Sequence, residues 1–225
     1  MSGLSSEARV DLQALCEQRA ATYGLLSRLY RVEVDAELLA ALRTMAFPLG
    51  SGSAEVDEGY RRIATYLSKN GDGARLDLAV DYVRTFLGHS NSGVSAAYPY
   101  ESVYTSEKRL LMQEARDDVM ALYGLAGMVI ENWVDPEDHI ALELEYMQIM
   151  AMRTGEALEK GDDDAALEYM GAQKSFMLDH LAAWAPMLTK DMKDFAKTDF
   201  YQGLAYLTEG FLRMDRAFLK TVVEG

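Results

Sequence analysis

Cysteine, proline and histidine are scarce in this chain of 225 residues, which has one cysteine, four prolines and three histidines. The single cysteine, Cys16, excludes an internal disulfide and a cysteine-rich metal site. No apolar run approaches the roughly 18 residues of a membrane span, so we expect no stable membrane insertion. The N-terminus lacks the basic region and following apolar stretch that a secretory signal has. These absences predict a cytoplasmic protein.

Basic residues are also in the minority, since 22 lysines and arginines stand against 36 aspartates and glutamates, for a formal net charge of -14. Affinity for nucleic acid depends mainly on Lys and Arg contacts to phosphates, so this balance opposes nucleic-acid binding. An acidic chain favours a basic partner. Acidity also simply keeps proteins in solution, and composition alone leaves both explanations open.

Sequence motifs of common enzyme and metal sites are absent. There is no G-x-S-x-G, Walker or G-x-G-x-x-G segment to support hydrolase, NTPase or dinucleotide-binding activity. The chain has no Glu-x-x-His element for a di-iron bundle, and His89, His139 and His180 form no pair at metal-ligand spacing. The acidic triplet 162–164 lacks the alternating ligands of a calcium loop and suits a helix start. We therefore expect neither a metal nor a cofactor.

Apolar residues recur at helical spacing along the whole chain, and no alternating β pattern interrupts them. Glycine and proline are concentrated in a few breaks between the periodic segments. The sequence therefore predicts an all-α fold, with a single helical domain over residues 1–225. Helices are expected at about 5–32, 36–45, 54–69, 73–87, 108–123, 135–153, 165–184, 188–197 and 199–223.

Residues 135–153 carry the strongest helix signal, with Asp135 expected as the N-cap and a proline at the first helical position. Helical winding surrounds this segment with apolar side chains and places His139 and Glu143 one turn apart among them. Such groups need partners, because an unpaired buried polar group costs about 1–3 kcal/mol. Two interpretations are open. Either Asp138 belongs to the cap while His139 and Glu143 bond each other or nearby backbone, or Asp138 and His139 stand at the mouth of a ligand-binding groove.

Residues 88–103 form the longest predicted loop. Loops of this length are uncommon in compact helical domains unless they have a function. The cluster Tyr98, Pro99 and Tyr100 combines a rigid backbone with flat aromatic area and hydrogen-bonding tips, which suits contact with a peptide. Packing of the loop onto the helices explains the same residues equally well.

Three segments, in this order along the chain, resemble the motifs of one protein family. They are Tyr82, Arg84, Phe86, Leu87 and Gly88; then Pro99, Tyr100, Ser102, Val103 and Tyr104; then Pro136, Asp138, His139, Glu143, Leu144 and Met147. These segments are similar to the patterns Y-x-R-L-F-x-G, P-P-[YW]-x-S-V-Y and P-x-D-H-x-x-x-E-L-x-x-M of the TorD/DmsD family of redox-enzyme maturation proteins, to which the NarJ-type chaperones are related. Outside residues 82–147 the likeness extends only to the layout of the helices.

The resemblance implies a TorD-like helical bundle that acts as a cytoplasmic chaperone rather than as an enzyme. Such a protein would bind the twin-arginine leader, the body, or both, of a molybdenum-cofactor oxidoreductase precursor and hold it until cofactor insertion and folding are complete. It would work as a monomer or homodimer. A leader couples an arginine pair to an apolar helical stretch, so carboxylates beside aromatic and aliphatic walls would complement both parts.

The resemblance and this chemistry together assign candidate peptide-binding roles. Asp138 and Glu143 are candidates for the polar contact with arginine, and His139 for orientation. The candidate apolar wall and its support are Tyr98, Pro99, Tyr100 and Tyr104, with Tyr82 and Phe86 beneath them. Adaptable apolar surface, or plain core, is expected from Met112, Met120, Met128 and Met147.

Two alternatives remain at this point. One is a NarJ-type assembly chaperone that acts on an enzyme subunit without a leader for export. The other is a protein of a different class, an enzyme or small-ligand receptor that uses His139 and Glu143. A bound metal or ligand would favour the second.

Overall fold

The computed structural model of the chain describes residues 4–48, 50–71, 73–88 and 96–224, and in this part no β-strand occurs. The all-α prediction is confirmed. The helices are α1 (Ser6–Arg31), α2 (Ala36–Thr44), α3 (Ala54–Lys69), α4 (Ala74–Tyr82), α5 (Glu101–Thr105), α6 (Glu114–Leu125), α7 (Ile140–Glu159), α8 (Asp163–Phe176), α9 (Ala182–Phe195) and α10 (Asp199–Glu224). Two π-helical turns, η1 (Val83–Leu87) and η2 (Met177–Leu181), continue α4 and join α8 to α9.

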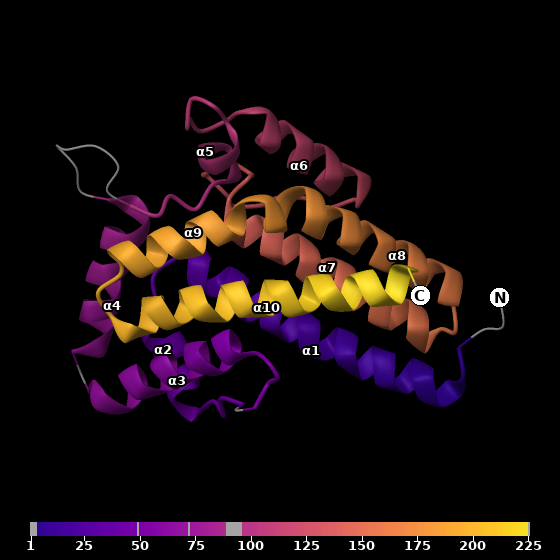
Figure 1. Ribbon diagram of the computed structural model, residues 1–225, viewed down its shortest axis with the longest axis horizontal. Coiled ribbons are helices and arrows are strands. Elements are labelled where there is room, and N and C mark those ends of the chain that lie inside the picture. The colour runs from indigo at the N-terminus through magenta and orange to yellow at the C-terminus, as the bar shows by residue number, and fades with distance from the viewer. Residues whose placement is uncertain (1–3, 49, 72, 89–95, 225) are drawn as a thin grey trace.

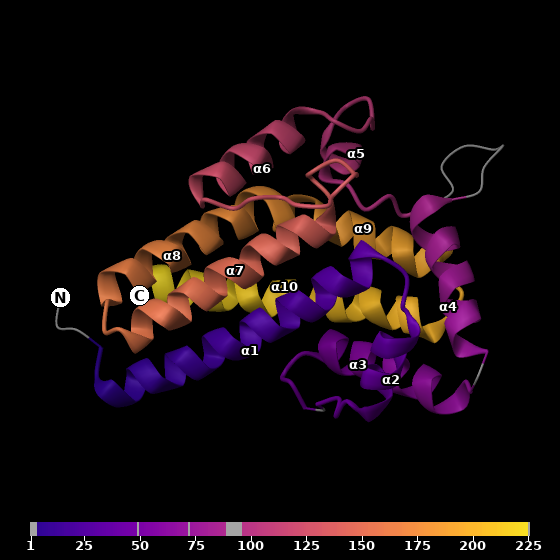
Figure 2. The same cartoon turned by 180° about the vertical axis from the view of Figure 1, so that it is seen from behind.

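The long helices form an elongated bundle, and α10 runs along it on the face turned toward the viewer in Figure 1. Helices α1 and α7 lie side by side, as the reverse view shows, and α3 packs along α10 (Figure 2). Helix α4 closes one end of the bundle. The short helices α5 and α6 lie along one edge of it, and α5 packs on α9.

A contiguous apolar core joins these helices from α1 to α10. Its largest members include Trp184, Tyr30 and Phe200, all fully buried. An aromatic side chain of this kind buries about 150–250 Å² of surface, and burial contributes about 25 cal/mol per Å² of apolar area. Apolar residues at helical spacing thus lie on one face of each helix, and these faces pack together in the core.

Helices α3 and α10 approach so closely that glycine is required at their contact. A Cβ atom on Gly203 would lie 2.8 Å from the carbonyl oxygen of Gly59, and one on Gly59 would lie 2.6 Å from the backbone nitrogen of Leu207. Real Cβ atoms do not approach backbone atoms this closely, because interiors are already packed to crystal-like density. The two glycines thus fix the position of α3 on the bundle.

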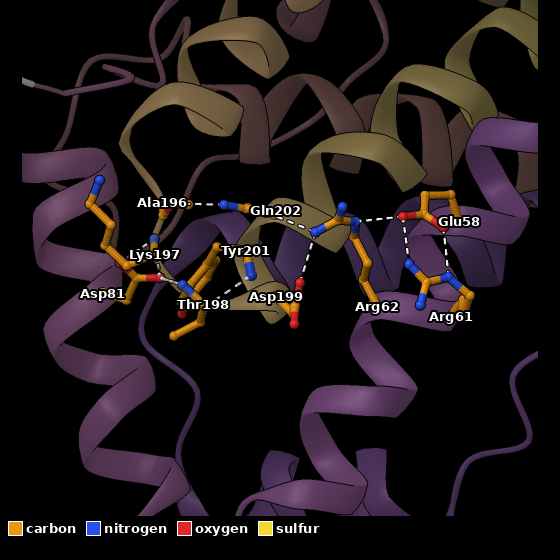
Figure 3. Close-up of polar contacts among 10 residues, drawn as sticks. All are labelled: Glu58, Arg61, Arg62, Asp81, Ala196, Lys197, Thr198, Asp199, Tyr201 and Gln202. Carbon is orange, nitrogen blue, oxygen red and sulfur yellow. Dashed lines mark hydrogen bonds and ion pairs between the residues drawn. The ribbon is translucent and has the colours of Figure 1, made fainter.

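Polar contacts fasten the outer helices to the turn between α9 and α10 (Figure 3). The buried Asp81 carboxylate of α4 accepts backbone N–H bonds from Lys197 at 3.0 Å and Thr198 at 2.7 Å. On the same side, Arg62 of α3 pairs with Asp199 at 2.7 Å, at the start of α10. The Asp81 carboxylate thereby pairs with backbone N–H groups between α9 and α10 that would otherwise lack a hydrogen-bond partner.

Several predicted boundaries are wrong. Helix α7 begins at Ile140 and not at Asp135, because the preceding residues form turns and then pair with the segment before α5. The predicted loop ends at Tyr100, where α5 intervenes, while residues 89–95 of that loop lie outside the described part. Residues 108–113 form an irregular segment with a turn and bends and no helix.

The break predicted between residues 184 and 188 does not occur, because Pro186 lies inside α9. A proline removes the hydrogen bond that its own N–H would have made in the helix. The π turn η2 directly precedes α9 and already alters the hydrogen-bond register there, since the Ala182 N–H reaches back five residues to Met177. Such turns are where helices accommodate irregular residues.

Gly203→Ala is expected to lower the free energy of unfolding by about 1–3 kcal/mol, because the new methyl group would overlap the backbone of α3. The matched control is Gly171→Ala in α8, where a Cβ meets nothing within 4 Å. There the loss of backbone freedom in the unfolded chain should raise stability by about 0.4–1 kcal/mol. Urea unfolding followed by circular dichroism measures both variants. Equal effects would contradict the close approach of α3 and α10.

Candidate functional site

The segment before α5 and the start of α7 are joined by a short antiparallel pairing between Tyr100 and His139. The Glu101 N–H donates to the Asp138 carbonyl at 2.9 Å, and the Ile140 N–H donates to the Pro99 carbonyl at 2.9 Å. These two bonds bring together residues that are about forty apart in the sequence. Two of the three motif segments thus meet in one place.

His139 is the N-cap of α7, since its Nδ1 atom accepts the Ala141 N–H at 3.0 Å. The buried ring lies edge-on between Tyr100 and Trp133, with centroids 5.1 and 5.2 Å away. Burial, with a smaller contribution from the Arg31 guanidinium, lowers the pKa of His139 to about 3. A neutral ring is also what the cap requires, because only an unprotonated Nδ1 atom can accept.

The Asp138 side chain is fully buried and faces α5. Its Oδ2 atom accepts the Ser102 N–H at 2.8 Å, and Oδ1 has no partner within the described residues. The Ser102 hydroxyl in turn accepts the Gln113 N–H at 3.1 Å. A chain of bonds therefore runs from the start of α7 through α5 to the end of segment 106–113.

Glu143 is also fully buried, one turn into α7. Its Oε2 atom accepts the Trp184 indole N–H at 3.0 Å, while Oε1 has no partner among the described residues. Burial, reinforced by the nearby Glu101 carboxylate, raises the pKa of Glu143 well above its ordinary value. Glu101 itself lies 3.0 Å from Nδ1 of His180 in η2. This buried polar network joins α5, α7, η2 and α9.

An apolar cavity of about 530 Å³ opens beside α5. We call it the apolar cavity, and its lining is Ala96, Tyr98, Val103, Tyr104, Arg109, Leu110, Leu111, Gln113 and Asp191. Tyr104 stacks on Trp184 at 5.6 Å and donates its hydroxyl to Asp191 at 3.1 Å. Leu110 and Leu111 are about half exposed at its rim. The cavity therefore presents apolar surface that the fold itself leaves uncovered.

The structure brings the predicted wall residues to this region but places them differently. Tyr98 and Tyr104 line the cavity, whereas Pro99 is buried and Tyr100 donates its hydroxyl to Asp135 at 3.1 Å. Asp138, His139 and Glu143 lie beneath α5, not among the residues lining the apolar cavity. Of the remaining candidates, three are core residues: Tyr82 and Phe86 contact each other there, and Met147 is fully buried. The other methionines lie nearer the surface, with Met128 partly buried against the core and Met112 and Met120 exposed.

The chain matches the profile of the family described as nitrate reductase delta subunit over residues 51–190. It is 30% identical to the chaperone protein TorD of Aliivibrio salmonicida, over 93% of this chain and 98% of that protein. The chaperone protein TorD of Photobacterium profundum is 31% identical, over 92% of this chain and 96% of its own length. The chain belongs to the TorD/NarJ-type family. This membership confirms the resemblance seen in the three motif segments.

Membership in the TorD/NarJ-type family also decides the broad class. Its relatives are named chaperones, so the expectation of a chaperone rather than an enzyme is confirmed. His139 and Glu143 both have structural contacts, since His139 caps α7 and one carboxylate oxygen of Glu143 accepts the Trp184 indole N–H. In the part of the chain that is described, no cluster of three or more His, Cys, Asp or Glu could hold a metal ion. No helix there has the length and apolar character needed to span a bilayer.

Several residues that organise the candidate site were not predicted from the sequence. Ser102 lies within the second motif segment, so the sequence marks it as a candidate, although it does not show that Ser102 contacts Asp138 of the third segment. Gln113, Trp184 and His180 lie outside all three segments and follow no local pattern that marks them. Only the fold reveals that they converge on α5.

His139 should make stability depend on pH with a definite sign. Its pKa is about 3 in the folded chain against an ordinary value of 6.5, so the unfolded chain binds the proton first as the pH falls. Stability is therefore lost on acidification, by about 2 kcal/mol between about pH 7 and about pH 5. His139→Asn keeps an acceptor for the cap and does not titrate, so this part of the loss should disappear. Urea unfolding across this range compares the two, and identical slopes would refute the assignment.

Glu143 should tolerate a neutral isostere better than truncation. Because its folded pKa is raised, its contribution to stability is present at low pH and is lost as the pH rises above about 4.5. Glu143→Gln keeps an acceptor for Trp184 without the charge, so stability near neutral pH should be unchanged or higher. Glu143→Ala leaves the indole N–H unpaired and should cost about 1–3 kcal/mol. Thermal unfolding tests this, and a Gln variant as unstable as the Ala variant would contradict it.

Proposed function

We propose that the chain is a cytoplasmic chaperone for a molybdenum-cofactor oxidoreductase, which it holds by the twin-arginine leader of the precursor until cofactor insertion is complete. The observation that carries this proposal is the apolar cavity, which lies beside a tyrosine-rich segment and is rimmed by exposed leucines. Its volume, about 530 Å³, lies within the range of ligand pockets. Family membership supports the chaperone class.

The apolar stretch of the leader would enter this cavity as an amphipathic helix enters a groove. Tyr98 and Tyr104 supply flat contact area, and Leu111 supplies apolar area at the rim. Burial of a leader side chain there contributes about 25 cal/mol per Å² of apolar surface. Pro99 and Tyr100 hold the wall in place through their contacts with the start of α7.

The buried candidates act in this proposal as positioning residues. Asp138 holds the N-terminus of α5, His139 caps α7 beneath it, and Glu143 holds the indole on which Tyr104 stacks. Tyr82 and Phe86 pack against each other in the core, and the Tyr82 hydroxyl donates to the carbonyl of Tyr30 at 2.9 Å. The whole chain would act as a single chaperone domain.

A second candidate function is a NarJ-type role on an enzyme subunit that is not exported. The observation that favours it is the family description, nitrate reductase delta subunit. The two functions differ in whether the leader alone is sufficient for binding. A purified client subunit that binds equally well after removal of its leader would support the NarJ-type role.

Leu111→Ser should weaken binding of a leader peptide about tenfold, equivalent to about 1.4 kcal/mol, because it removes apolar area from the cavity. The matched control is Leu125→Ser on α6, where the leucine is 86% exposed and does not line the cavity. This variant should bind within about twofold of the native chain. Calorimetric titration with synthetic leaders of molybdoenzymes measures the affinities. A folded native chain that binds none of these leaders would refute the proposed function.

A further inference from the structure

A second cavity, of about 460 Å³, lies on the other side of α5. We call it the acidic cavity, and it is lined by Glu101, Thr105, Ser106, Glu107, Gln113, Glu114, Ala115, Asp118, Asp179 and His180. Four exposed carboxylates from three parts of the chain converge here: Glu107 after α5, Glu114 and Asp118 one turn apart on α6, and Asp179 in η2. Among the described residues that line it there is no lysine or arginine.

Among the described residues, no lysine or arginine pairs with any of the four exposed carboxylates. Within the described part of the chain, none of them forms a hydrogen bond or an ion pair. Carboxylates that serve the fold elsewhere are paired, as Asp163 is with Arg9 and Glu137 is with Arg116. The acidic cavity therefore concentrates negative charge without an internal partner for it, and low-dielectric walls strengthen the resulting field.

The inner wall of the acidic cavity also offers an acceptor. His180 is 7% exposed, and its Nδ1 atom is engaged with the Glu101 carboxylate at 3.0 Å. When Nδ1–H donates to that carboxylate, Nε2 carries the lone pair, and it has no partner among the described residues. A guanidinium has five N–H donors and no acceptor, so an acceptor-rich cavity of this kind matches it.

The two cavities are neighbours that share a wall. Gln113 lines both of them, and α5 turns Val103 and Tyr104 to the apolar cavity and Glu101 and Thr105 to the acidic one. A peptide that crosses segment 106–113 would meet apolar surface on one side and carboxylates on the other. The complementary ligand has basic side chains next to an apolar stretch.

We propose that the acidic cavity binds the arginine side chains of the same leader whose apolar stretch occupies the apolar cavity. This inference rests on the proposed function and adds the polar half of the recognition. It assigns the arginine contact to Glu107, Glu114, Asp118 and Asp179 in place of Asp138 and Glu143. Those two carboxylates are fully buried, and each is already engaged through one oxygen with α5 or α9.

A double-mutant cycle tests the inference. The variant Glu114→Gln/Asp118→Asn neutralises two carboxylates of the acidic cavity. The control variant Asp11→Asn/Glu17→Gln makes the same change of net charge at exposed positions on α1. Each folded protein is titrated calorimetrically with a synthetic leader peptide that has an arginine pair and with the same peptide carrying glutamines at those two positions.

The neutralised cavity should bind the arginine peptide at least tenfold more weakly than the native chain, and the glutamine peptide within about twofold. The control variant should bind both peptides as the native chain does. Equal weakening of both peptides, or no weakening of either, would overturn the assignment to the acidic cavity while leaving leader binding intact. Failure of the native chain to bind the arginine peptide would overturn the proposed function and this inference together.

Discussion

The hydrogen bond from the Ser102 N–H to the buried Asp138 carboxylate ties α5 to the start of α7. A helix as short as Glu101–Thr105 is not stable in isolation, because nucleation costs more than so few hydrogen bonds return. Its position depends instead on bonds to its neighbours: Asp138 from below, His180 from η2, and Asp191 from α9. Since α5 separates the two cavities, the shape of both follows from this buried anchoring.

Different carboxylates would bind the leader and hold the helices in position. Those that hold the fold are buried and receive N–H donors, as Asp138, Glu143 and Asp81 do. Those that would meet a basic ligand, such as Asp179 in the acidic cavity, are exposed and have no partner in the described part of the chain. The physical reason is desolvation: burying an unpaired charge costs several kcal/mol, whereas a charge kept in water costs little until a partner covers it.

Much of the fold was predictable because its determinants are local. The caps Ser5, Asp35 and Ser53 each accept an N–H at the helix start that the sequence indicates. The start of α7 was not predictable, because Asp135 and its proline resemble a cap, while a tertiary pairing with the segment before α5 delays the helix. The candidate site also depends on tertiary contacts, so the sequence predicted its location but not all of its residues. The motif segments mark where it lies, but the partners from α9 and η2 carry no local signal.

Hydrogen–deuterium exchange of the native chain, with and without a saturating synthetic leader peptide, shows where a leader lies on the chain. Ligand that covers the two cavities shields the backbone between them and stabilises it against local opening. We expect slower exchange in residues 96–118 and 177–181 when the leader is bound, with exchange at the α3–α10 contact unchanged. Protection confined to α1, α3 or the outer face of α10, with none in residues 96–118, would contradict this expectation.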